Sequence, residues 1–160
     1  MTHANQINGG TAAFDSGLLT ATGAETVYDT TVIIPFALNG KLFRKAAVTD
    51  GATPTTAGDG SALSTLTASQ GCVMVWCLNS AGTVGVFQSD VKTLDGANAF
   101  VTVPSFPTIN LDTWCPFAYQ VLKAASTAGT ITFGSSNWNA TGFTNAIVNV
   151  HTLPPRPQDS

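Results

Sequence analysis

Charged side chains are scarce in this chain. Only 9% of its residues are Asp, Glu, Lys or Arg, whereas about 25% is usual for a soluble domain. A free surface needs charges of mixed sign to keep molecules apart in solution. Thr, Ser, Asn, Ala and Gly stand in their place. We therefore expect much of the surface to lie against other subunits of an assembly.

The few charges are unevenly distributed. Residues 1–40 contain three acids and no Lys or Arg, and from residue 41 onward six acids balance six bases. The formal net charge of −3 therefore comes from the N-terminal quarter. No basic stripe follows the chain, so we expect no nucleic-acid partner. The adjacent pair Arg44-Lys45 is expected on a solvated strand.

Long apolar runs are also missing. No segment approaches the ~18 apolar residues that a membrane-spanning helix needs. Residues 1–6 have neither the basic start nor the apolar run of a signal peptide. The sequence therefore predicts synthesis in the cytoplasm and no membrane partner.

Cysteine is represented by Cys72, Cys77 and Cys115. An odd number excludes a complete set of intrachain disulfides. Each cysteine lies in an apolar stretch, which favours buried free thiols, although Cys115 paired with either of the others stays open. The spacing contains no zinc signature, and we predict no metal and no cofactor.

Groups suited to catalysis are few. Histidine, the usual proton carrier near neutral pH, occurs only at His3 and His151. The chain has no Gly-x-Ser-x-Gly nucleophile motif, and Glu25 is its only Glu, so paired glycosidase carboxylates are not indicated. We predict that the protein is not an enzyme and assign no catalytic residue. A hydrolase that uses His151 is the last of the alternatives.

What the sequence does contain is a series of short apolar segments separated by turn residues, without a helical period. This pattern predicts an all-β fold, either an antiparallel sandwich or a jelly-roll-like barrel. Asn39-Gly40 predicts a hairpin between residues 31–38 and 41–48. Pro35 cannot donate to a strand ladder, which places the first of these strands at a sheet edge or a bulge.

The segment Cys72–Leu78 is apolar at every position. Even positions would point to one face and odd positions to the other, which predicts a strand covered on both sides. A turn at 79–82, with Gly82 in the left-handed conformation, would lead into a strand at 83–89. Further strands are expected at 100–103, 117–124, 130–134 and 146–151.

Three parts of the chain differ in composition. Residues 1–25 have few large apolar side chains, and we expect an extended N-terminal arm that contributes little core. Residues 26–152 form the predicted β-sandwich or barrel body. Residues 153–160, which include three prolines, predict a stiff, extended C-terminal tail of polyproline type.

Several phrases between residues 34 and 157 resemble a known class of protein. These are PFALNGKLFRKAAVTDGATPT, VWCLNSAGTVGVFQSD, PFAYQVLKA, FGSSNWNATG and LPPRP. They are similar to small β-rich structural proteins in the virions of tailed bacteriophages, near the capsid decoration (cement) proteins and related head or fibre components. The resemblance implies an all-β fold, an oligomer such as a trimer, and docking onto the capsid lattice. It carries no motif-matched functional residue.

The predicted function is that of a structural virion protein that decorates and cements a capsid from its exterior. Its expected partners are the major capsid protein and copies of itself. The expected contact residues lie in the arm, the loop 135–142 and the tail: Asn5, Ile7, Phe14, Trp138, Leu153, Pro154, Pro155 and Arg156. The alternative is a fibre-tip or carbohydrate-binding module in which Trp138, Asn137 and Asn139 contact a glycan. Trp138 fits a core anchor and a contact surface equally well.

Overall fold

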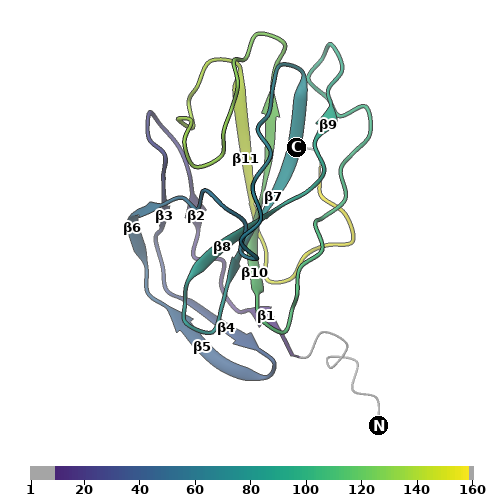
Figure 1. Cartoon of the computed structure of the whole chain (residues 1–160). Coiled ribbons are helices and arrows are strands. Elements are labelled where there is room, and N and C mark those ends of the chain that lie inside the picture. Colours follow the sequence, from purple (N-terminus) through teal and green to yellow (C-terminus); the bar gives the residue numbers. More distant parts are fainter. Residues whose placement is uncertain (1–9, 159–160) are drawn as a thin grey trace.

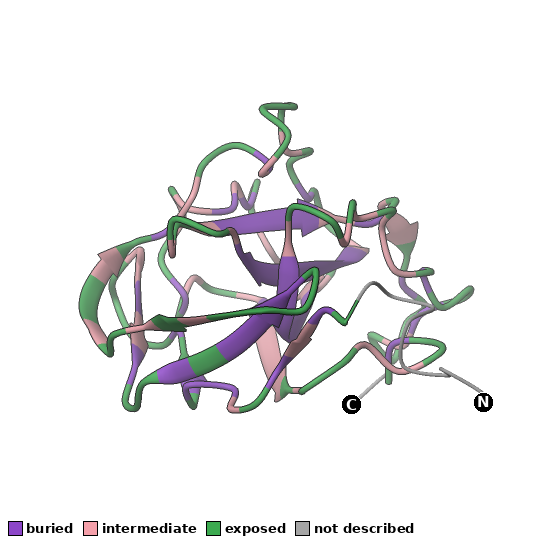
Figure 2. Ribbon diagram, turned by 90° about the horizontal axis from the view of Figure 1, so that it is seen from below, coloured by how far each residue is buried: buried purple, intermediate pink, exposed green. Residues whose placement is uncertain are grey.

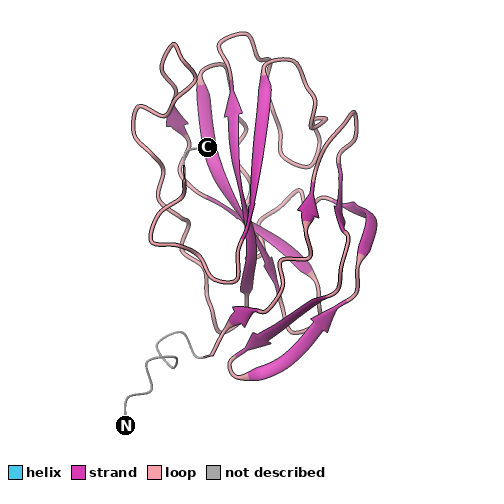
Figure 3. Ribbon diagram, turned by 180° about the vertical axis from the view of Figure 1, so that it is seen from behind, coloured by secondary structure: helices cyan, strands magenta, loops and turns pink. Residues whose placement is uncertain are grey.

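The fold is seen in a computed structural model that describes residues 10–158. These residues form eleven strands, and Figure 3 shows no helix among them. The strands pair antiparallel in three sheets that pack together without closing into a barrel. The predicted all-β, sandwich-like class is therefore confirmed.

The largest sheet lies at the centre of the molecule, and its strand order is β11-β10-β7-β8, with β9 beside β7. Figure 1 shows its long strands side by side. Their bounds are Gln70–Leu78 for β7, Val84–Gln88 for β8, Lys92–Thr93 for β9, Cys115–Ala124 for β10 and Phe143–Asn149 for β11. Nearly all of β7 and β10 is buried, which Figure 2 shows as a purple centre within pink and green loops.

Strand β7 has a separate core on each of its faces. Cys72, Met74, Trp76 and Leu78 belong to one buried cluster, and Val73, Val75 and Cys77 belong to the other. The predicted two-sided strand is confirmed, because side chains alternate between the faces of a sheet. The first cluster is called core one below, and the second core two.

Two small sheets cover core one. The first has the order β1-β4-β5, with β1 at Ala12–Ala13, β4 at Ile34–Leu38 and β5 at Lys41–Lys45. The second has the order β2-β3-β6, with β2 at Leu19–Thr20, β3 at Val27–Thr30 and β6 at Val48–Ala52. The Trp76 side chain projects from β7 into core one, where its ring centroid lies 5.2 Å from that of Tyr28 in β3 and 5.7 Å from that of Phe133 in the segment between β10 and β11.

Core two is covered by loops instead of a sheet. Phe106, Ile109, Trp114 and Leu153 pack against it. Phe106 meets Tyr119 edge-on at 5.1 Å between centroids. The backbone N–H of Gln158 donates to the Tyr119 hydroxyl at 3.2 Å. The C-terminal segment thus closes over the protein's own sheet.

The predicted hairpins have the expected backbone conformations. Asn39 and Gly40 both have positive φ, 52° and 73°, between β4 and β5. Gly82 has φ 73° in the turn between β7 and β8. The edge position expected for Pro35 was wrong, because β4 lies between β1 and β5. Strand β1 ends at Ala13, one residue before the position opposite Pro35. The Phe14 N–H donates to the Pro35 carbonyl at 2.8 Å, but Pro35 has no N–H to return the bond, so the β1–β4 ladder stops there.

Two expected strands do not form. Segments 100–103 and 130–134 make only isolated bridges, at Phe100 and Ile131. The hairpin partner of β10 is β11, and β7 occupies its other edge. Both edges of β10 are therefore filled, so residues 130–134 have no edge to join.

The expected N-terminal arm is wrong for the residues that the structure describes. Ala13, Leu19 and Ala21 are buried in core one, and both β1 and β2 lie before residue 25. Small side chains suffice here because the backbone itself comes close to its neighbours: the Ala13 N–H donates to the His151 carbonyl at 3.0 Å. Residues 1–9 lie outside the described part of the chain.

Candidate functional site: an uncovered sheet face

The β1-β4-β5 sheet has one buried and one uncovered face. Ile34, Phe36 and Leu38 point into core one, and Phe43 stacks on Phe36 at 5.5 Å. Directly paired residues share a face of a sheet. The register pairs therefore place the side chains between these on the other side, and put Lys41 and Lys45 on the inner side with Leu38 and Ile34. Phe14, just past β1, joins the other side through the hydrogen bond from its N–H to the Pro35 carbonyl. This outer face consists of Ala12, Phe14, Pro35, Ala37, Leu42 and Arg44.

The outer face is apolar apart from Arg44. Leu42 is 77% exposed and Phe14 is 55% exposed, and Pro35 beside them is exposed as well. Single exposed apolar residues are normal, but a contiguous group of them marks an interaction surface. Within residues 10–158, both Leu42 and Phe14 thus keep more than half of their surface open.

The loops at one end of this sheet add three more exposed apolar residues: Leu18, Val32 and Ile33. The two loops are joined, because the Gly17 carbonyl accepts from the Thr31 N–H at 2.8 Å and the Val32 N–H at 3.4 Å. Leu18 has a φ of 48° and is 53% exposed. A leucine in the left-handed region is strained, and burial of its side chain does not offset that strain.

The charges near the outer face are not neutralised within the described chain. The one ion pair of residues 10–158 joins Lys92 Nζ to Asp90 Oδ2 at 3.6 Å. Arg44 on this face thus has no carboxylate partner there. Lys41 and Lys45, at the ends of β5, pair with Leu38 and Ile34 and belong to the other side of the sheet. Asp15, which follows Phe14, accepts only the Gly17 N–H, at 3.0 Å, among the hydrogen bonds of this segment.

Of the predicted contact residues, Phe14 lies on the outer face. Asn5 and Ile7 lie outside the described residues. Trp138 does not form a contact surface. It is only 3% exposed, and its Nε1–H donates to the Val27 carbonyl at 2.7 Å. The indole anchors core one, edge-on to Phe133 at 5.5 Å. Asn137 and Asn139 therefore flank no exposed ring on which a sugar can stack.

The predicted tail residues lie on the other side of the central sheet, where loops cover core two. Leu153 packs against that core, and Pro157 is buried. Pro154, Pro155 and Arg156 line an open groove of about 620 Å³ together with Val103. The tail is thus held by its own subunit, and only one side of it faces outward.

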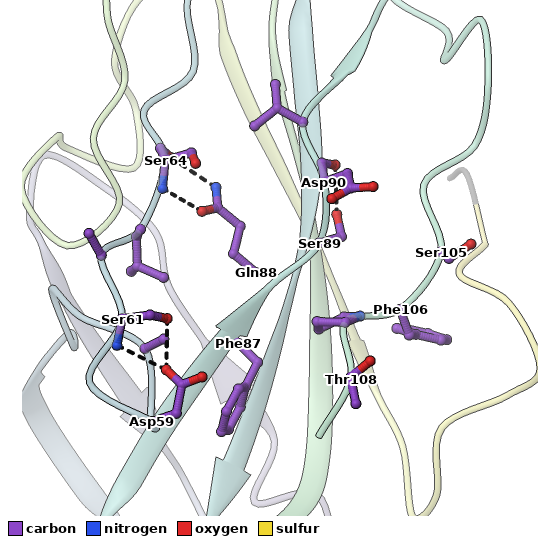
Figure 4. A pocket seen from close by; sticks show the side chains of 15 residues that line it. Asp59, Ser61, Ser64, Phe87, Gln88, Ser89, Asp90, Ser105, Phe106 and Thr108 are labelled. Atoms are coloured by element: carbon purple, nitrogen blue, oxygen red, sulfur yellow. Dashed lines mark hydrogen bonds between the residues drawn. The ribbon is translucent and has the colours of Figure 1, made fainter. Parts of the chain in front are cut away.

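A second groove, of about 560 Å³, lies between residues 57–64, the end of β8 and residues 105–108. Figure 4 shows Asp59 and Ser61 on one side and Asp90, Ser105 and Thr108 on the other. Gln88 is held between them by two hydrogen bonds to the Ser64 backbone, at 2.6 and 2.9 Å. The lining can hydrogen-bond a polar ligand.

The ionisable side chains that line this groove are two carboxylates, Asp59 and Asp90. No His, Cys or Lys lines it. The hydroxyl and N–H of Ser61 donate to Asp59 and lower the pKa of its carboxyl below the usual value, so Asp59 is ionised at neutral pH. A general acid needs a raised pKa, closer to the working pH.

The three cysteines are buried free thiols, as predicted. Burial raises the pKa of Cys72 to about 11 and that of Cys115 to about 12. Nucleophilic cysteines need a lowered pKa, so these thiols serve packing. His151 is exposed, and its Nδ1 shares a hydrogen bond with the Ala13 carbonyl at 3.0 Å. Within residues 10–158, no three His, Cys, Asp or Glu side chains gather as metal ligands.

No protein-family model, curated protein or solved structure matches the chain. In the described part of the chain, no helix has the length and apolar character needed to cross a membrane. The outer face is therefore the main indication of function.

Most of the outer face was not predicted from the sequence. Pro35, Leu42 and the loop residues around Leu18 were not among the predicted contacts. A signal existed, since Asn39-Gly40 fixes the register of the hairpin. That register alone places Pro35, Leu42 and Arg44 on one side, opposite Phe36 and Phe43.

Proposed function

We propose that the protein is a structural component of a bacteriophage virion that decorates and cements the capsid. The observation that carries the proposal is the uncovered apolar outer face in a chain with only 9% charged residues. Such a face is costly in water, and contact with a partner would bury it. The resemblance of residues 34–157 to decoration proteins supports the choice of a virion as the assembly.

The mechanism is adhesion. Each contact would gain roughly 25 cal/mol per Å² of apolar surface removed from water. Many such contacts on one particle act together, because attachment at one site raises the effective concentration at the next. The partners in this proposal are the major capsid protein and further copies of the chain, on the exterior of the capsid.

The experiment uses virions purified from the phage that encodes this chain. Quantitative mass spectrometry should find hundreds of copies per particle. Particles grown without the gene should lose DNA at a lower temperature, and addition of the purified protein should restore their heat resistance. Absence from the particle contradicts the proposal, and a dozen copies or fewer would assign the protein to a tail or fibre instead.

A further inference from the structure

We infer that the outer face binds the outer face of a second copy of this chain, about a twofold axis parallel to β4. This inference rests on the proposed adhesive function and names one partner for it. It comes from the order of side chains across the β1-β4-β5 sheet, which is complementary to itself under this one rotation.

The geometry follows from the register. Ala12, Ala37 and Leu42 form one row across the three strands. Phe14, Pro35 and Arg44 form the next row, because the Phe14 N–H donates to the Pro35 carbonyl and Pro35 pairs with Arg44. Neighbouring strands are about 4.8 Å apart, so β1 and β5 lie about 10 Å apart on either side of β4. Rotation about an axis along β4 exchanges these two edges and keeps each row at its own level.

In the first row, this rotation sets Leu42 of each copy over Ala12 of the other. Leu42 is the most exposed of the large apolar side chains, and Ala12 leaves space for it beside Ala37. Facing positions that alternate large and small side chains interdigitate well. Ala37 lies at the axis and is only 7% exposed within one chain, so its small side chain lets the sheets approach but adds little new contact.

In the second row, the rotation sets Arg44 over the Phe14 ring of the other copy. A guanidinium over an aromatic face is a favourable cation–π pair, stronger once it is removed from water. Asp15 takes no part in this pair, because its carboxylate accepts the Gly17 N–H of its own loop at 3.0 Å. Because a twofold contact repeats every pair, both Arg44 residues and both Phe14 rings acquire partners.

The face is favoured over the strand edge as the contact. Strand β5 is the outer strand of its sheet, and it carries Lys41, Arg44 and Lys45. Basic residues on an edge strand oppose pairing with another edge. An unrelated partner would have to supply both the cation and the ring that this face already contains. A second copy supplies both.

The first test is self-association of the full chain, measured by sedimentation and by light scattering after size exclusion. The wild type should form a concentration-dependent dimer. Leu42→Asp should raise the dimer Kd by roughly 100-fold or more, since it buries a carboxylate against Ala12. Arg44→Ala should raise it roughly tenfold. Val101→Asp is the matched control, because Val101 is 68% exposed elsewhere on the molecule, and it should leave Kd unchanged.

The second test fixes the orientation with a short bismaleimide cross-linker. Ala12→Cys protein carrying a large tag is mixed with untagged Leu42→Cys protein. Cross-linked heterodimer should form in the mixture, whereas each variant alone should cross-link little, since like positions lie on opposite edges. The native thiols should not compete, because all three are buried. Circular dichroism and thermal unfolding confirm that each variant is folded.

A wild-type monomer at several hundred micromolar overturns the inference, as does a dimer that Leu42→Asp leaves intact. Equal cross-linking of Leu42→Cys with itself overturns the axis. These outcomes are distinct from failure of the proposed function. A dimer that is absent from virions contradicts the capsid role alone, and a monomer that still binds particles contradicts only the self-association.

Discussion

The central sheet and the β1-β4-β5 sheet differ in how their apolar faces are covered. In the central sheet, the small sheets cover one side of β7 and loops cover the other, so no residue of β7 after Gln70 is exposed. In the β1-β4-β5 sheet, one side packs on core one and the other carries Leu42 and Phe14 in the open. The chain covers its central apolar faces completely. A face that residues 10–158 leave open nearby is therefore best explained by a partner.

Mutation should affect the covered and the open sheet most differently at Trp76 and Leu42. Trp76→Ala should lower the free energy of unfolding by about 3–5 kcal/mol, because it opens a cavity between Tyr28 and Phe133. It also removes the indole N–H that Gln120 Oε1 accepts at 3.1 Å. Leu42→Ala should change the same quantity by less than about 0.5 kcal/mol.

Urea unfolding at micromolar protein, where a dimer would be dissociated, checks both variants. Similar losses for the two would show that the outer face contributes to folding of the single chain. The contrast between a covered and an open sheet would then fail.

Alkaline pH should act on the central sheet through its three thiols, which all lie in β7 and β10. Burial raises the pKa of Cys72 from 9.0 to about 11. A folded-state pKa above the unfolded value gives stability that is complete below pH 9 and is lost as the pH rises toward 11. At about 1.4 kcal/mol per pH unit, this loss is about 3 kcal/mol for Cys72.

Urea unfolding between pH 8 and 11 measures this loss. The free energy of unfolding should fall more steeply for the wild type than for Cys72→Ala. Equal slopes would mean that water reaches the thiol, and that core one is less completely closed than its neighbours indicate.

Close packing inside the central sheet can be tested with two glycines. A Cβ at Gly71 would lie 2.7 Å from the Leu122 carbonyl oxygen and 2.7 Å from the Phe100 ring. Because a backbone oxygen cannot move aside, Gly71→Ala should destabilise the protein by about 2 kcal/mol. Gly96 has nothing within 4 Å of such a Cβ, and Gly96→Ala should be neutral. Thermal unfolding of the two variants decides the point, and equal melting temperatures would contradict it.

The sequence predicted the features that depend on local patterns and missed those that depend on contacts distant in the chain. Strand β7 was predicted together with the composition of its two faces, because alternation is a local property. The N-terminal segment was misjudged as an arm because Ala13 and Ala21 are small, and their burial depends on contacts distant in the chain. The same is true of Trp138, whose indole N–H donates to Val27, 111 residues away. The β4–β5 hairpin was predicted from its turn. The side chains on its outer face follow from the register that this turn fixes, but they were not predicted.

The smallest expected effect concerns the strained loop beside the outer face. Leu18 has a φ of 48°, and asparagine adopts this conformation with less strain. With the side chain 53% exposed, Leu18→Asn should raise the free energy of unfolding by about 0.5–1 kcal/mol, since little apolar contact is lost. Asn39→Leu, at a φ of 52° in the β4–β5 turn, is the reciprocal control and should lower it.

Chemical unfolding of monomeric protein measures both variants. A natural leucine that is less stable than asparagine would be retained for its exposed side chain and not for the fold, as expected of a loop that borders a binding face. If Leu18→Asn instead destabilised the protein, its side chain would support the loop from within the same chain. Leu18 would then be removed from the open surface, which would be reduced to the sheet and the pair Val32 and Ile33.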